Sequence, residues 1–170
     1  RATLDAMTAE VVEALPDFRR FLLAKSQHLG VGSTLPWSSL VASVDSRSSG
    51  LEWSTAVDRV RAAFSSYSEP LDRLAARAVD ERWIDAEPRP GKAGGAFCMP
   101  VRDEISRILM TFDGSADAIQ TLAHELGHAY HNVALGSRTW LQRQTPRCLA
   151  ETVSIFCETL VVEEMLRAPG

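Results

Sequence analysis

The segment HELGH, residues 124–128, places two histidines four residues apart with a glutamate between them. On a helix, residues four apart lie one turn above each other, so His124 and His128 would project from the same face. Their imidazole nitrogens could take adjacent corners of a zinc tetrahedron, about 2.0–2.1 Å from the metal. Glu125, about 100 degrees further around the helix, could stand beside a metal-bound water and accept its proton. The segment therefore predicts metal-activated hydrolysis, with one Zn²⁺ per chain and Glu125 as the general base.

The competing interpretation is an ordinary apolar helix that happens to carry histidines. HExxH fixes only three residues, and such a pattern occurs by chance in many unrelated helices. The surroundings favour a site, because the helix is largely apolar between Ile119 and Ala129 and polar side chains there need partners. A metal ion would be one partner that satisfies both histidines.

A site with two histidines requires a third protein ligand. One arrangement continues the motif as HExxHxxGxxH, but His131 and Ala134 hold the positions of its glycine and third histidine, which excludes that class. Another arrangement takes a glutamate from a following helix. Glu151, in CLAETVSIFCETL, comes 23 residues after His128, and the loop between them is long enough to turn the chain back. Glu151 is therefore the candidate third ligand.

Two further carboxylates could orient a ligating histidine through the ring nitrogen that does not bind the metal. Glu158 lies seven residues after Glu151, on the same helical face. Asp117, two turns before His124, is the other candidate, although the helix dipole equally favours a carboxylate in the first turn of a helix. For Glu151 and Glu158, the alternative is a solvated helix face, where most helical glutamates lie.

Capping and turn residues predict the elements that would hold these side chains. AFCMPV (96–101) and SRILMTF (106–112) are short apolar runs that predict two strands joined by a polar turn. Asp113-Gly114-Ser115 then predicts the start of a helix that runs to about Leu135. After a polar loop, Thr145-Pro146 predicts the start of the last helix, with threonine as the cap.

The first part of the chain predicts one helix and a long connection. Apolar spacing predicts a helix over residues 8–29, kinked or split at Pro16 and ended by Gly30 and Gly32. Serine-rich residues 33–50 predict a connection. We expect it to pack on the body of the protein through its apolar residues, which are Leu35, Trp37, Leu40 and Val41.

Two more helices are predicted at about 52–66 and 69–84. The proline- and glycine-rich run EPRPGKAGG, residues 87–95, ends this helical part of the chain. The sequence therefore predicts a helical region before the active site, residues 1–86, and a catalytic core, residues 87–170. We expect the two to form one structural unit.

The composition limits the class of partner. With 18 basic and 22 acidic residues, the chain has no default affinity for nucleic acid or an anionic membrane, and no apolar run is long enough to span a bilayer. Cys98, Cys148 and Cys157 are odd in number and lack CxxC spacing, which favours a reducing cytoplasm. Because the chain starts at Arg1 without methionine and ends straight after a helical stretch, we expect an internal piece of a longer protein.

Three segments together resemble the M3 family of zinc metallopeptidases, specifically its oligoendopeptidase F branch. They are GKAGGAFCM, SRILMTFDGSADAIQTLAHELGHAYH and LAETVSIFCETL. Looser agreement upstream extends the resemblance over nearly the whole chain. The resemblance implies a mainly α, zincin-like metallopeptidase core with a small β-hairpin or sheet before the HExxH helix. It also implies that oligopeptides are cut inside a deep channel.

The resemblance assigns roles to individual residues. It implies that the zinc ligands are His124, His128 and Glu151, with Glu125 as the base that activates water. It also implies that an extended peptide substrate pairs with the strand containing Gly95, Ala96, Phe97 and Cys98, as in β-augmentation. The alternative for this strand is a purely structural hairpin.

The sequence also departs from the family. Val153 and Cys157 stand in the glutamate helix where smaller or polar residues are expected, and Cys157 could be a buried apolar residue. The family supplies tyrosine and histidine side chains beyond this helix to stabilise the oxyanion, whereas this chain holds only Tyr67 and Tyr130. His131 could help near the metal or simply pack. Without such donors we expect slow hydrolysis or none.

The sequence therefore predicts a zinc endopeptidase of oligopeptides, present as a catalytic core without the oxyanion-stabilising segment. One alternative is a non-catalytic helical interaction domain. Another is a zinc exopeptidase with the same ligands. Apolar surface left exposed by truncation could support oligomerisation.

Overall fold

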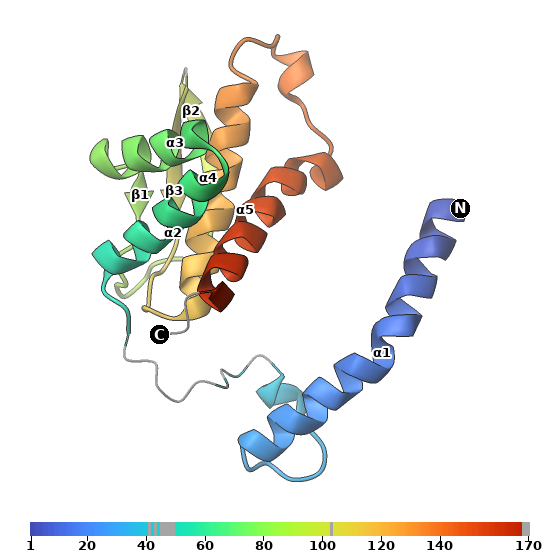
Figure 1. The fold of residues 1–170 in the computed structure, drawn as a ribbon. Coiled ribbons are helices and arrows are strands. Elements are labelled where there is room, and N and C mark those ends of the chain that lie inside the picture. Colours follow the sequence, from blue (N-terminus) through green and yellow to red (C-terminus); the bar gives the residue numbers. More distant parts are fainter. Residues whose placement is uncertain (41, 43, 45–49, 103, 168–170) are drawn as a thin grey trace. The chain divides into compact units, whose positions relative to one another are not determined.

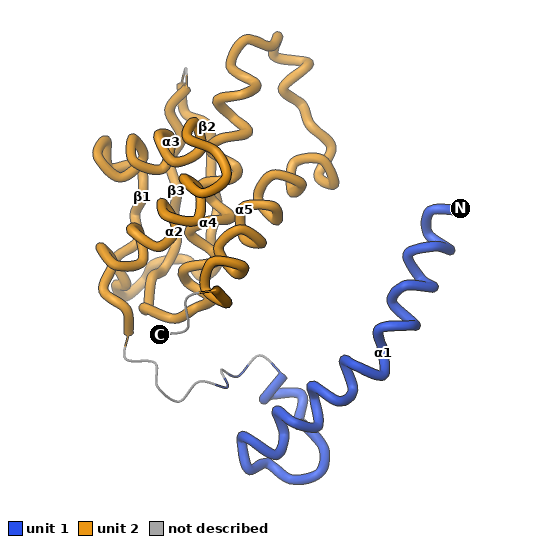
Figure 2. The backbone as a smooth tube through the Cα atoms, viewed as in Figure 1, with its two compact units in different colours: residues 1–47 blue, residues 48–170 orange. Residues whose placement is uncertain are grey.

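The chain forms two compact units, residues 1–47 and 48–170 (Figure 2). The structure is a computed structural model that describes residues 1–40, 42, 44, 50–102 and 104–167. The helices predicted near 52–66 and 69–84 belong to the same unit as the HELGH segment. The functional division of the chain at residue 87 stays a prediction.

One long helix dominates the first unit. Helix α1 (Ala2–His28) runs through Pro16 without a break, and its axis bends along its length (Figure 1), so of the two predicted alternatives the helix is bent and not split. The helix ends where the glycines predict. Leu29 is its C-cap, and Gly30 has a φ of +65°, a left-handed conformation that glycine adopts without steric cost.

The segment after α1 folds back on the end of that helix. Lys25 Nζ donates a hydrogen bond to the carbonyl of Leu40 at 2.7 Å, and the short 3₁₀ helix η1 (Trp37–Ser39) lies just before it. Within this unit Leu40 is half-buried and Trp37 is 86% exposed. The packing of this connection on the body of the protein stays a prediction. Val41 lies outside the described residues.

Among the described residues, the second unit holds four α-helices and a three-stranded sheet (Figure 1). In chain order these elements are α2 (Trp53–Tyr67), α3 (Glu69–Asp80), β1 (Ile84–Asp85), β2 (Phe97–Arg102), β3 (Ile105–Leu109), α4 (Ala116–Ala134), the 3₁₀ helix η2 (Leu141–Arg143) and α5 (Arg147–Arg167). The predicted fold class, mainly helical with a small sheet before the motif helix, is confirmed. None of the described helices is long and apolar enough to cross a membrane.

The sheet has the strand order β1-β3-β2. Strands β2 and β3 pair antiparallel, which confirms the predicted strand pair, and β1 pairs parallel to β3 with Ile84 opposite Ile108. Strand β1 was not predicted, because the helix predicted before it extends to residue 84. Helix α3 instead ends at Asp80, and Arg82 reverses the chain with a φ of 56°. In this strand order β2 lies at one edge of the sheet.

Helix α4 is held by packing against α2, α3, α5 and two strands of the sheet. Its N-terminus forms as predicted, because Ser115 Oγ accepts a hydrogen bond from the amide of Ala118 at 3.1 Å. Ile119, Leu122 and Leu126 point into the core and are almost completely buried. Each such side chain contributes about 1.5–3 kcal/mol of burial free energy, which fixes the position of the motif helix.

Candidate metal centre

The side chains of His124, His128 and Glu151 converge on one point. His124 Nε2 and His128 Nε2 lie 3.0 Å apart, and Glu151 Oε2 lies 3.3 Å from each of them. Ligands about 2.05 Å from a tetrahedral metal are separated by roughly 3.3 Å, so the three atoms have the spacing of three corners of one tetrahedron. The described residues thus contain a group that could hold a metal ion.

Glu151 reaches the histidines because α4 and α5 cross closely, and Gly127 permits this crossing. A Cβ atom at Gly127 would lie 2.7 Å from Ser154 Cα and 3.1 Å from Cys157 Sγ, both on α5. The sequence carries a signal for this role of Gly127 that was not part of the prediction. Glycine inside a helix costs about 1 kcal/mol relative to alanine, so it needs a packing reason.

Two further hydrogen bonds fix the orientation of the converging side chains. Glu158 contacts His124 Nδ1, and a proton on that nitrogen leaves Nε2 as the lone-pair donor that faces Glu151. Ser154 Oγ donates to Glu151 Oε2 at 3.0 Å, and this hydrogen bond lowers the pKa of Glu151. The sequence does not predict this role of Ser154, because the hydrogen bond depends on the rotamer that lets its hydroxyl reach back one turn.

Glu125 lies buried beside the cluster, with 4% of the residue exposed. Its Oε2 atom has no hydrogen-bond partner among the described residues, and burial raises its pKa to about 7. A buried carboxyl oxygen without a partner is unfavourable, which suits a position that receives a polar ligand. Burial also lowers the pKa of His128 and so favours the neutral imidazole that binds metals.

A cavity of about 530 Å³ opens beside the cluster. Its lining includes the three converging residues, Glu125, and Ala96, Phe97 and Cys98 at the start of β2. Gly95 comes directly before them, with a φ of +84°. The rest of the lining comes from the end of α4, which includes His131, from the segment between α4 and α5, and from the start of α5. Three of the four residues predicted to bind substrate therefore face the same cavity as the cluster.

Other residues singled out from the sequence lie elsewhere. Asp117 is exposed in the first turn of α4, about 10 Å along the helix axis from His124, so the structure does not bring it to the cluster. The ring of Tyr67 packs on Phe156, with ring centres 4.8 Å apart. Tyr130 lines a different cavity, beside α3. Neither tyrosine lines the cavity at the cluster.

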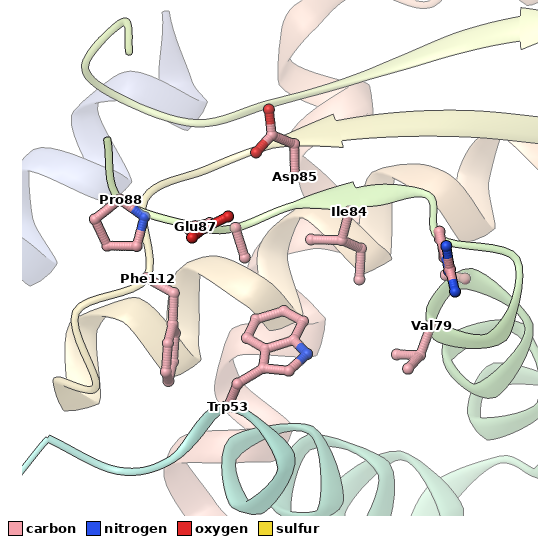
Figure 3. A pocket seen from close by; sticks show the side chains of 10 residues that line it. Trp53, Val79, Ile84, Asp85, Glu87, Pro88 and Phe112 are labelled. Atoms are coloured by element: carbon pink, nitrogen blue, oxygen red, sulfur yellow. The ribbon is translucent and has the colours of Figure 1, made fainter. Parts of the chain in front are cut away.

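A second cavity of similar volume lies between α2, α3 and β1 and shares no lining residue with the first. Figure 3 shows its apolar wall, where the rings of Trp53 and Phe112 meet edge to face with centres 5.2 Å apart. The nearby Asp85 carboxylate is bound by Arg89 at 2.6 Å and Lys92 at 3.0 Å. These ion pairs lower the pKa of Asp85 and hold it as a structural anion. Of these two cavities, the first is the one lined by the group that could hold a metal ion.

Comparisons with known proteins identify the family of the chain. Residues 48–168 match the model of Peptidase family M3, a family of metallopeptidases, and the chain belongs to that family. Over 112 residues it is 30% identical to the chromosomal oligoendopeptidase F of Lactococcus lactis subsp. cremoris, which covers 65% of this chain and 19% of that protein. Over 164 residues it is 22% identical to an oligoendopeptidase F homolog of Lactococcus lactis subsp. lactis, which covers 96% of this chain and 27% of that protein. The chain thus spans about a fifth to a quarter of the length of these relatives.

Two crystal structures share the fold. One is a protein from Bacillus anthracis assigned as an oligoendopeptidase F, with a TM-score of 0.75 and 18% identity over 97% of this chain and 31% of that chain. The other is a protein from Chlamydophila abortus assigned as a peptidase, with a TM-score of 0.72 and 21% identity over 98% of this chain and 28% of that chain. The arrangement of helices and sheet is therefore that of oligoendopeptidase F-like proteins.

Proposed function

We propose that this chain carries the zinc centre of an endopeptidase that hydrolyses oligopeptides. The observation that carries the proposal is the convergence of His124 Nε2, His128 Nε2 and Glu151 Oε2 at 3.0–3.3 Å, beside the buried Glu125. Two imidazoles and one carboxylate form a ligand set typical of catalytic zinc. When bound, zinc would polarise a peptide carbonyl and make water a stronger acid.

Each protein side chain at the centre has a separate task in this proposal. Glu125, which does not converge with the other three, accepts the proton of the attacking water and passes it to the leaving amine. Glu158 holds His124 in one tautomer and one ring orientation. Ser154 restricts the Glu151 carboxylate to the rotamer that faces the histidines.

An extended peptide would bind along β2. This strand lies at the edge of the sheet, and its first residues line the cavity that contains the cluster. A peptide that adds to this edge would hydrogen-bond through its backbone, which fits a peptidase that accepts many sequences. Gly95, Ala96, Phe97 and Cys98 are the residues that we assign to this contact.

We further propose that hydrolysis by the 170 residues alone is slow. The chain has two tyrosines, and both lie away from the cavity at the cluster, so neither is placed to stabilise an oxyanion there. Losing one such donor typically costs about 10²–10³ in rate.

Free thiols at Cys98, Cys148 and Cys157 support a reducing, cytoplasmic location. Exposed apolar side chains on α1 would support self-association, which sedimentation over a range of concentrations would detect.

Metal analysis tests the proposed centre directly. We expect close to one equivalent of zinc in the dialysed wild-type chain and in Glu125→Gln, and much less in His124→Ala, His128→Ala and Glu151→Ala. Glu125→Gln is the matched control, because it changes the same helix without removing a ligand. Equal zinc in wild type and His124→Ala would refute the assignment.

Mapping the cleavage of a peptide blocked at both ends would then separate endopeptidase from exopeptidase action.

A further inference from the structure

A smaller hollow, distinct from the cavity beside Trp53, lies next to the cavity at the metal cluster, along β2. It has a volume of about 330 Å³ and lies against Pro100, Val101 and Arg102, at the other end of the strand. The two cavities share four lining residues, which are Asn132, Leu135, Arg143 and Gln144. The two cavities are therefore neighbours along β2, one at the metal cluster and one at the end of the strand, and together we call them the β2 groove.

The walls of the β2 groove are held by hydrogen bonds. Asn132, on α4, donates to Ser106 Oγ at 3.1 Å and so ties the motif helix to β3. The segment between α4 and α5 forms another wall, and Arg143 fixes it by donating to the carbonyl of Arg138 at 3.0 Å and to that of Gly136. A groove with fixed walls can select a ligand by shape, because binding does not first have to order the walls.

Trp140 stands on the wall opposite β2 and is 72% exposed. Val101 on β2 is 58% exposed, and Leu135 at the end of α4 is half-buried, and both line the same hollow. Single exposed apolar side chains are common on proteins. Here two of them and the half-buried Leu135 line one hollow next to the cavity at the metal cluster, together with polar side chains such as Arg143 and Gln144. The hollow therefore offers an apolar group three apolar contacts among polar ones.

The length of the strand sets the distance between this hollow and the cluster. Cys98 lines the cavity at the cluster. Val101, three residues later, lines the smaller hollow and not the cavity at the cluster. Three residues of extended chain span about 10 Å. A peptide paired with β2 advances by the same length per residue, so a side chain three or four residues from the scissile bond would reach Trp140.

We propose that Trp140, Val101 and Leu135 form a specificity subsite for a large apolar side chain, preferably aromatic, three or four residues to one side of the scissile bond. This inference rests on the proposed peptidase function. The indole face would stack on an aromatic ring, and the two aliphatic side chains would enclose its edge.

Phosphinic peptides test this subsite, because their tetrahedral phosphinate binds zinc and fixes which residue lies at the metal. One phenylalanine is moved through every position on both sides of the phosphinate in an otherwise alanine and serine peptide. Affinity for the zinc-loaded chain is measured by fluorescence anisotropy. We expect about three- to ten-fold tighter binding when phenylalanine is three or four residues away, on one side only. Trp140→Ala should remove this preference, and Trp140→Phe should keep most of it.

Trp37→Ala is the matched control, because Trp37 is also a highly exposed tryptophan but lies in the first unit. Val101→Ser weakens the subsite from the opposite wall and serves if Trp140→Ala does not fold. Zinc-dependent binding that does not vary with the position of phenylalanine, or that Trp140→Ala and Val101→Ser leave unchanged, overturns the subsite and leaves the peptidase proposal intact. Binding that does not depend on zinc overturns the peptidase proposal itself.

Discussion

Helices α1 and α4 both carry apolar residues at helical spacing, but they differ in what covers them. In α4, eight of 19 residues are buried, and Leu122 and Ile119 are fully enclosed. In the 27 residues of α1, only Lys25 and Ser26 are buried, while Leu4 is 68% exposed. Apolar periodicity therefore predicts that a helix forms, but it does not predict how much of that helix its own unit buries.

The difference matters for chemistry. Metal ligands must be held to within a fraction of an ångström, and packing on several sides provides that precision. Helix α4 has such packing, whereas the described residues of the first unit offer α1 almost none. Two of the three candidate ligands, His124 and His128, lie on this well-packed helix.

Truncating one leucine on each helix should give the largest contrast. Leu122→Ala leaves a cavity in the core of the second unit, and we expect it to lower the free energy of unfolding by about 2–5 kcal/mol. Leu4→Ala makes the same chemical change on the exposed face of α1 and should cost less than about 0.5 kcal/mol. Urea unfolding followed by circular dichroism measures both. Similar losses would show that α1 is as well packed as α4.

The close crossing of α4 and α5 can be broken by adding a single methyl group. Gly127→Ala should destabilise the chain by about 1–3 kcal/mol, because the helices must separate to admit the Cβ atom. Since Glu151 moves with α5, zinc affinity should fall about tenfold. Gly94→Ala is the control, because no atom lies within 4 Å of its Cβ position. Zinc titration that shows equal affinity for both variants would argue against the role of this crossing.

Cysteine labelling provides the mildest probe of packing. Burial raises the pKa of the Cys157 and Cys98 thiols to about 12, so both stay protonated, and therefore unreactive, near pH 8. Cys148 is exposed near the start of α5. We expect iodoacetamide to modify Cys148 first and Cys157 last, as followed by mass spectrometry of digested samples. Rapid modification of native Cys157 would mean that α5 does not stay packed on α4.

The sequence alone determined most of the helices, the strand pair and the identity of the converging residues. Those features depend on local signals: the Ser115 cap, the breakers around residues 87–95 and the spacing of His124 and His128. Such signals act within a few residues and do not need the rest of the fold. The resemblance to the M3 family rested on the same segments, and the family assignment confirmed it.

Only the tertiary structure decided which long-range pairs form. Strand β1 is two residues long and forms because it pairs with β3. Asp117 and Glu158 were both plausible partners of a ligating histidine in the sequence, but in the fold only Glu158, on α5, contacts His124. The same holds for the groove that joins β2 to Trp140. Contacts between residues far apart in the chain depend on how helices cross and how strands align, and local spacing does not encode either.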